Sequence, residues 1–299
     1  MMNKIPHDQN SEANLHLLAA QRELYGRAKH YAAFQLLVSF IAPTSAVFSL
    51  LPKPWIALTG LAIAVLDALV LDAGQLRRRE AAAKVQETFD TSVLDLPWNK
   101  LKVGPKPDPE DVHEAASISL RRTGDSALRD WYPPKAAEVP SAVGRSICQR
   151  ANVVWDSRLR TRYRAAVAWV VALTSAAVLV VSLAQKLTVE TMTISVLAPL
   201  TPLLLWSIRE WQRESRAMES LKRLDATVNE YVDDAVTGRA NAEELDRRAR
   251  LIQDEIYDRR RQNPLIFDWV YTLLRTRFEE HMAVGAETLV GRYKISERK

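Results

Sequence analysis

Hydrophobic residues in this chain are gathered into four long stretches that form two close pairs. The first pair covers Tyr31–Leu51 and Trp55–Leu71, and the second covers Ala165–Ala184 and Val189–Ile208. Each stretch approaches the ~20 apolar residues that an α-helix needs to cross a bilayer. Because the connection within each pair is very short, the pattern predicts an integral membrane protein with four transmembrane helices in two hairpins.

The segments outside these stretches show helical spacing of apolar residues and no convincing strand pattern. We therefore expect an all-α fold with a helical cytoplasmic domain. The expected parts are a cytoplasmic N-terminal helix (1–30), a first transmembrane hairpin (31–71), a central cytoplasmic segment (72–164), a second transmembrane hairpin (165–208) and cytoplasmic C-terminal helices that pack with the central segment (209–299).

The central segment is predicted to alternate between helices and rigid turns. Helices are expected over Arg77–Leu94 and Glu114–Arg122. Prolines between them predict a loop over Lys102–Val112, since proline cannot donate the backbone hydrogen bond of a helix interior. Asp130–Pro134 is expected to be a rigid turn, and Ser141 to begin a helix that continues into the third apolar stretch.

Helix boundaries in the C-terminal third are marked by capping residues. The fourth apolar stretch is expected to continue as a helix to Val236, with Gly238 as its stop signal. Asn241 is a suitable N-cap for the next helix. Asn263 and Pro264 offer a cap followed by proline at the first helical position, so we expect the last helix to begin there.

Two apolar stripes at helical spacing predict buried helix faces. A core or subunit contact explains them better than a cofactor site, because their spacing is that of a packing seam. The N-terminal stripe contains Leu17, Leu18, Leu24, Tyr25 and Ala28, with Leu15 off that face; the second contains Trp211, Met218, Leu221, Leu224, Val228, Tyr231 and Ala235.

Positive charge is concentrated at one end of each apolar pair. The chain has a net formal charge of +5, and its mean hydropathy of −0.16 averages apolar and highly charged stretches. The turn within each pair holds a single lysine, whereas arginines gather at the outer ends. Because cytoplasmic flanks collect Lys and Arg, both hairpins are expected to enter the membrane from the cytoplasm, turn on its far side and return, which leaves both termini and the central segment in the cytoplasm. Buried helices of a large soluble protein explain this combination less well.

The composition offers little for catalysis or metal binding. The chain has nine glycines, five histidines and one cysteine, Cys148, and it lacks a phosphate-binding glycine loop, a paired-cysteine motif and a nucleophile elbow. Many carboxylates lie near Lys or Arg at helical spacing, as on solvated, ion-paired helix faces. We therefore expect no enzyme active site, no cofactor and no metal site.

Four residues within the apolar stretches are candidates for a pore or a gate. Asp67 lies inside the second stretch, where an ionisable group normally faces protein or water. A wet position near the interface, or a bond to a neighbouring hydroxyl, explains it equally well. Pro43, Pro199 and Pro202 interrupt helix hydrogen bonding and can kink a helix, although a simple packing role is the commoner use of such kinks.

Arginine and aromatic residues interleave in the central segment. Such groups can hold a nucleotide by pairing with its phosphates and stacking on its bases. The alternative is that the arginines meet anionic lipid and the tryptophans belong to the core. The candidate ligand-binding residues are Arg121, Arg122, Trp131, Arg150, Asn152, Trp155 and Arg158.

Three segments carry a family resemblance: Phe89–Asn99 (FDTSVLDLPWN), Cys148–Asp156 (CQRANVVWD) and Asn263–Trp269 (NPLIFDW). Together with two membrane hairpins around a cytoplasmic domain, they make the chain resemble the SMODS-associated four-transmembrane effector family over nearly its whole length.

That resemblance implies a role in bacterial cyclic-oligonucleotide antiphage signalling (CBASS). A partner cyclic-nucleotide synthase would make the second messenger on infection. The effector, a homo-oligomer in the lipid bilayer of the inner membrane, would bind the cyclic oligonucleotide and permeabilise the membrane as a pore. The leading alternative is a non-conducting membrane scaffold that binds a protein partner; a small transporter is less favoured, because the third apolar stretch has no ionisable residue.

Overall fold

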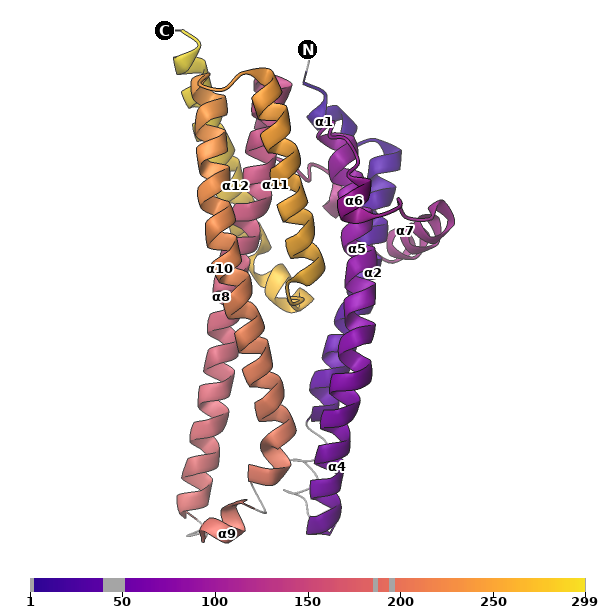
Figure 1. The fold of residues 1–299 in the computed structure, drawn as a ribbon, viewed down its shortest axis with the longest axis vertical. Helices are drawn as coiled ribbons and strands as arrows, with labels where there is room; N and C mark the ends of the chain where they lie inside the picture. Colours follow the sequence, from indigo (N-terminus) through magenta and orange to yellow (C-terminus); the bar gives the residue numbers. More distant parts are fainter. Residues whose placement is uncertain (1–2, 40–51, 185–187, 194–196, 299) are drawn as a thin grey trace.

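The computed structural model describes residues 3–39, 52–184, 188–193 and 197–298. These residues form helices joined by short connections, and no strand is found among them. Long helices run side by side along the molecule, with both termini at one end and the ends of the helix pairs at the other (Figure 1). The all-α expectation is confirmed for this part of the chain.

The first hairpin pairs α2 (Glu12–Ser39) with the continuous rod formed by α4 (Lys53–Leu66), a π-helical turn (Asp67–Leu71) and α5 (Asp72–Val93). α2 packs along α5 on one side and against α7 (Pro109–Thr123) on another. Burial on two sides explains why Leu15, off the predicted apolar face, is buried as well as Leu18.

The second hairpin pairs α8 (Ser141–Ala184) with α10 (Ala198–Thr237), with the short α9 (Val189–Met192) between them. The predicted start of α8 at Ser141 is confirmed. Gly238 ends α10 with a φ of 70°, in the left-handed region that favours glycine. The two hairpins touch through α10 and α4.

The remaining elements complete the end of the molecule that carries the termini. α11 (Ala242–Gln262) packs against α5 and α8, and α12 (Asp268–Ser296) packs against α8 and α10. Smaller pieces are the helices α1 (Ile5–Asp8) and α6 (Lys100–Val103), together with 3₁₀ turns at Ser126–Leu128 and Pro134–Glu138.

The main hydrophobic core lies between these helices, at the end that carries the termini. The predicted α10 stripe contributes Leu221, Val228 and Tyr231 to it. Trp211, the first residue of that stripe, is instead about half exposed. The stripe is therefore a core-packing face within one chain along most of its length.

Two predicted boundaries are wrong. α7 begins at Pro109, because Asp108 caps it and proline suits the first helical position; the expected loop over Lys102–Val112 is therefore shorter and contains the end of α6. Asn263 and Pro264 do not begin a helix, and α12 starts only at Asp268.

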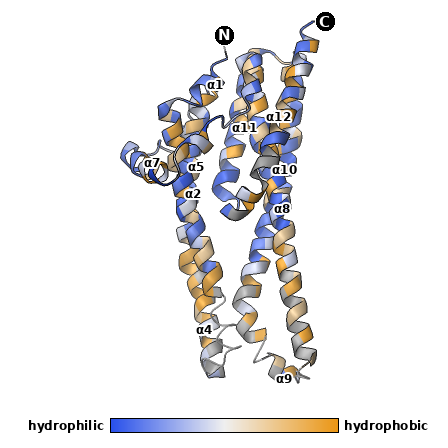
Figure 2. Ribbon diagram, turned by 180° about the vertical axis from the view of Figure 1, so that it is seen from behind, coloured by the Kyte–Doolittle hydropathy of each residue, from blue (hydrophilic) through white to orange (hydrophobic). Residues whose placement is uncertain are grey.

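The opposite ends of the hairpins expose many apolar side chains. Hydrophobic colouring is concentrated there, whereas hydrophilic residues predominate toward the termini (Figure 2). The part of the first predicted span at 40–51 lies outside the described residues. Among the residues that are described, no helix is both long enough and apolar enough to cross a membrane. The exposed apolar residues include Phe34, Leu37, Trp55, Leu58, Leu61, Leu69 and Val70 in the first hairpin and Trp169, Val170, Leu173, Val180, Leu205 and Ile208 in the second.

Candidate ligand-binding cavity

A cavity of about 600 Å³ lies among the helices where the two hairpins and the C-terminal helices meet. Its walls come from α2, α5, α8, α10, α11 and α12, and from the connections around residues 123–131 and 263–266. The end of α11 and the start of α12 lie midway along the molecule (Figure 1). The cavity therefore sits close to the boundary between the polar and the apolar halves.

The cavity wall has an excess of positive charge. It contains five cationic side chains, Arg22, Lys29, Arg160, Arg259 and Arg260, and two carboxylates, Asp156 and Asp268. Both carboxylates are ion-paired with cations of the same wall, Asp156 with Arg160 and Asp268 with Lys29. The excess suits an anionic ligand, because arginine and lysine pair strongly with phosphate.

Aromatic and apolar side chains make up much of the remaining wall. Tyr25 enters from α2, Trp131 from the segment after α7, and Trp155 from α8. Trp131 packs edge-on against the buried Phe89, which fixes its ring. Rings beside cations are the arrangement that binds bases and phosphates together.

Two buried amide side chains of the wall have unsatisfied atoms. Gln21 Oε1 and Asn263 Nδ2 have no hydrogen-bond partner among the described residues. Both residues are less than a tenth exposed, and both line the cavity. A buried polar atom without a partner costs about 1 to 3 kcal/mol, so these atoms favour a ligand or water that bonds them.

The connection between α11 and α12 is held extended by two buried arginines. Arg79 donates to the carbonyl oxygens of Arg261 and Asn263 at 2.7 and 2.8 Å. Arg160 donates to the carbonyl oxygen of Pro264 at 3.0 Å. These bonds satisfy backbone acceptors that a helix would have used, which explains why the last helix starts late.

Arg160 also joins the cavity to α10. Its guanidinium ion-pairs with Asp156 on the cavity wall and with the fully buried Glu214 on α10, each at 2.9 Å. Burial raises the pKa of Glu214 to about 7, against the opposing charge of Arg160. A group that competes for Arg160 would leave Glu214 without its main partner.

A second buried network lies behind the cavity. Asp90 on α5 accepts hydrogen bonds from Tyr132 Oη at 2.7 Å and from Arg260, and Gln253 bridges it to Glu87 at 2.8 Å on each side. Arg250 donates to Glu87 at 2.7 Å. Because Arg260 lines the cavity, this network sets the position of one of its cations.

Three of the predicted ligand-binding residues come together in the cavity wall. Trp131, Asn152 and Trp155 all line it. Asn152 donates through Nδ2 to Tyr132 Oη at 3.2 Å, which connects it to the buried network.

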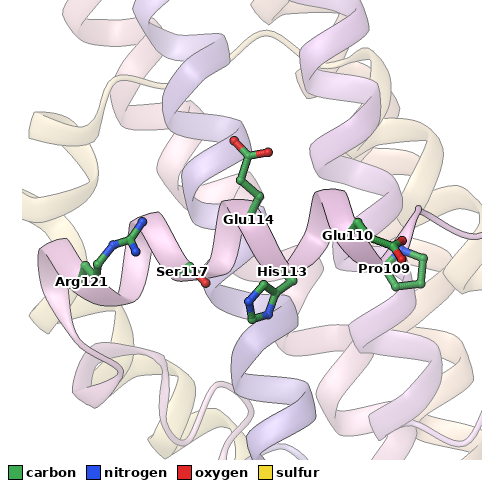
Figure 3. A pocket seen from close by; sticks show the side chains of 6 residues that line it. All are labelled: Pro109, Glu110, His113, Glu114, Ser117 and Arg121. Carbon is green, nitrogen blue, oxygen red and sulfur yellow. The ribbon is translucent and has the colours of Figure 1, made fainter.

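The other four predicted ligand-binding residues lie elsewhere. Arg121 is exposed on α7 and lies at one end of an open, shallow surface (Figure 3). Arg122 is exposed and ion-pairs with Glu23 at 3.3 Å. Arg150 donates to Asn229 at 2.7 Å, and Arg158 is exposed beside His281, at 2.7 Å. Neither of the last two lines the cavity.

The predicted pore and gating residues are only partly described. Pro43 lies outside the described residues. Asp67 is the first residue of the π-helical turn between α4 and α5. Pro199 is the second residue of α10, where a proline costs little because the first helical N–H groups have no intrahelical partner. Pro202 is the fifth residue of α10, where proline removes one donor of the helical hydrogen-bond ladder. Among the three candidates that the structure describes, Asp67 coincides with a helix irregularity, the π-helical turn.

Sequence reasoning missed several residues of the wall. The N-terminal helix contributes Gln21, Arg22 and Lys29, and the end of α11 contributes Arg259 and Arg260. The Arg259–Arg261 run next to a family-like segment was an available signal. From the sequence alone these side chains are indistinguishable from solvated ones, because the sequence does not show which helix packs against them. Within the described part of the chain, no group of three or more His, Cys, Asp or Glu side chains is placed to hold a metal ion.

Comparison with known proteins places the chain in a family. A family model for the SMODS-associating 4TM effector domain matches residues 3–289. A protein of Bacillus cereus (strain VD146) named "Probable CBASS effector molecule" is 26% identical over 286 residues, which cover 92% of this chain and 94% of that protein. No solved structure matches the chain. The matching model describes an effector domain and covers nearly the whole chain, so the chain belongs to the SMODS-associating 4TM effector domain family.

Proposed function

We propose that this protein is a membrane effector of antiphage defence. It binds a cyclic oligonucleotide in the cavity of about 600 Å³ and then permeabilises the bacterial inner membrane as a homo-oligomeric pore. The observation that carries the proposal is the cavity wall, in which cations and aromatic rings from both hairpins face one space. The family and the CBASS effector among its relatives supply the antiphage context.

The exposed apolar side chains support the membrane placement. Soluble monomers rarely expose contiguous apolar patches larger than a few hundred Å². Here such residues cover the far ends of both hairpins, while the core and the charged surface lie at the other end. A bilayer around the hairpin ends would bury these side chains, and it would leave the cavity on the cytoplasmic side with both termini.

Arg160 is the proposed connection between binding and opening. A ligand phosphate that pairs with Arg160 competes with Glu214, a buried carboxylate on the helix that continues into the second hairpin. Losing this partner shifts the balance between existing arrangements of α10 and α8. The pore is the arrangement that binding favours.

The proposal is tested with the full-length protein in dye-loaded liposomes. Addition of a panel of 3′,3′-cyclic di- and trinucleotides is expected to release dye for at least one member. Release by none of them would contradict pore formation. Binding without release would favour the non-conducting scaffold.

A matched pair of lysine variants tests whether the cavity is the binding site. Lys29 lines the cavity and ion-pairs with the exposed Asp268, whereas Lys294 ion-pairs with the exposed Glu138 away from it. Lys29→Gln is expected to raise the half-maximal ligand concentration about tenfold, as for a lost charged hydrogen bond. Lys294→Gln is expected to leave it unchanged. Equal effects of the two variants would place the binding site elsewhere.

A further inference from the structure

The unsatisfied amides of the cavity carry an inference about ligand specificity, which rests on the proposed function. Gln21 Oε1 is a free acceptor and Asn263 Nδ2 is a free donor among the described residues. They come from α2 and from the α11–α12 connection, and both line the cavity. An amide presents one donor group and one acceptor group, in contrast to a carboxylate or a guanidinium.

Nucleobases differ in the groups that complement them. Adenine offers an N6 amino donor next to the N7 acceptor, and asparagine or glutamine amides are its usual partners. Guanine offers two acceptors on one edge, which suit arginine, and two donors on another, which suit a carboxylate. A purine also stacks more strongly on aromatic rings than a single-ring pyrimidine does.

The carboxylates and the arginine of this cavity that could bind guanine already pair with other protein groups. Asp156 is ion-paired with Arg160, and Asp268 with Lys29. Arg260 bonds the buried Asp90. The phosphates of a cyclic oligonucleotide would further occupy the cations. Gln21 Oε1 and Asn263 Nδ2 have no such competing partner in the part of the chain that the structure describes.

We propose that Gln21 and Asn263 read an adenine base, so that the ligand is a cyclic oligonucleotide containing at least one adenine. The N6 amino group of adenine donates to an amide oxygen, and a ring nitrogen accepts from an amide N–H. Trp131 and Trp155, on the same wall, favour a purine over a pyrimidine.

The test measures affinities of the full-length protein in detergent for 3′,3′-cyclic di-AMP, di-GMP and di-UMP, and for the matching cyclic trinucleotides. Within each ring size the ligands have equal charge and differ only in the base. An adenine-containing member is expected to bind at least about tenfold more tightly than its guanine and uracil counterparts.

Isosteric variants identify the reading groups. Gln21→Met and Asn263→Leu each remove an amide that has a buried unpaired atom, so the melting temperature without ligand is expected to stay the same or rise. Each variant is expected to lose most of the adenine preference, while its affinity for the guanine ligand stays within about threefold of wild type. The guanine ligand thus controls for damage to the phosphate contacts.

The outcomes separate this inference from the proposed function. Binding with equal affinity across bases, or with a guanine preference, overturns the adenine assignment and leaves the proposed function standing. An adenine preference that survives in both variants overturns the role of Gln21 and Asn263. If no member binds, the proposed function fails and the base assignment fails with it.

Discussion

Glu87 and Asp90 lie one turn apart on α5 and are both fully buried. Carboxylates near Lys or Arg at helical spacing were expected to be solvated, and for Glu87, three residues after Lys84, that expectation is wrong. Arg250 and Arg260 come from α11, far along the chain, and enclose the two acids with Gln253. Ion pairs between distant helices cannot be recognised from local spacing, which is why this network was not expected.

The buried Glu87 gives the protein a pH-dependent stability. Burial, with the neighbouring Asp90 charge, raises the pKa of Glu87 from 4.5 to about 7. Between these values the folded protein keeps a proton that the unfolded chain has lost, so this group's contribution to stability falls as pH rises from about 4.5 to 7. The effect is at most about 3 kcal/mol. Relative to Glu87→Gln, the wild-type melting temperature is expected to rise as pH is lowered from 8 to 5.

Glu138→Gln is the matched control. Glu138 is exposed, and its hydrogen bonds with Lys135 and Lys294 lower its pKa to about 2. Its protonation therefore does not change between pH 5 and 8. The difference in melting temperature between wild type and Glu138→Gln should therefore stay constant from pH 5 to pH 8. If the difference in melting temperature between wild type and Glu87→Gln is also constant over this range, the pKa of Glu87 is not raised in the folded protein.

At the scale of single helices, two glycines make a contrasting pair. In α2, a Cβ added at Gly26 meets nothing within 4 Å, whereas in α8 a Cβ added at Gly144 lies 2.8 Å from the carbonyl oxygen of Ala136. Gly26→Ala is expected to stabilise the protein by up to about 1 kcal/mol, since alanine favours a helix. Gly144→Ala is expected to destabilise it by about 1 to 3 kcal/mol through overpacking.

Thermal denaturation of the two variants in the same detergent checks this prediction. A rise in melting temperature for Gly144→Ala would mean that the turn at Pro134–Glu138 moves away at little cost. A fall in melting temperature for Gly26→Ala would contradict the open space beside Gly26 on α2.

Helix boundaries were predictable where the signal is local. Asn241 caps α11 by accepting from Glu244 N at 2.9 Å, and Gly238 ends α10, as expected. The boundary at Asn263 was not predictable, because its carbonyl oxygen is bonded by Arg79 from another helix. Local capping chemistry is visible in a sequence, whereas competition from distant side chains is not.

The cavity shows the same limit at the scale of the whole molecule. Trp131, Asn152 and Trp155 could be predicted, because aromatic residues and arginines interleave along this part of the sequence. Gln21 and Lys29 could not, because only the folded chain brings α2 to the same cavity as α8 and α11. The sequence indicated the kind of chemistry, and the packing of distant helices determined which residues supply it.

Topology is testable by cysteine labelling. Cys148 is buried, and burial raises its pKa, so the native thiol should react little. Val189 begins α9 and Ile295 lies close to the C-terminal end of α12, and both are exposed. α9 and the C-terminus lie at opposite ends of the molecule (Figure 1). In intact spheroplasts, a membrane-impermeant maleimide is expected to label Val189→Cys and to label Ile295→Cys only after lysis. Equal labelling of both before lysis would contradict the proposed orientation.

The cavity is walled by helices of both hairpins, and this shared wall has a consequence for the surrounding lipid. Under the proposed function, the ligand's affinity depends on how the hairpins lie relative to each other. Hairpin tilt responds to the thickness of the bilayer around it. By thermodynamic reciprocity, a bilayer that favours the ligand-bound arrangement must tighten binding by the same factor by which the ligand favours that arrangement. Lipid composition would then set the threshold of messenger at which a cell responds.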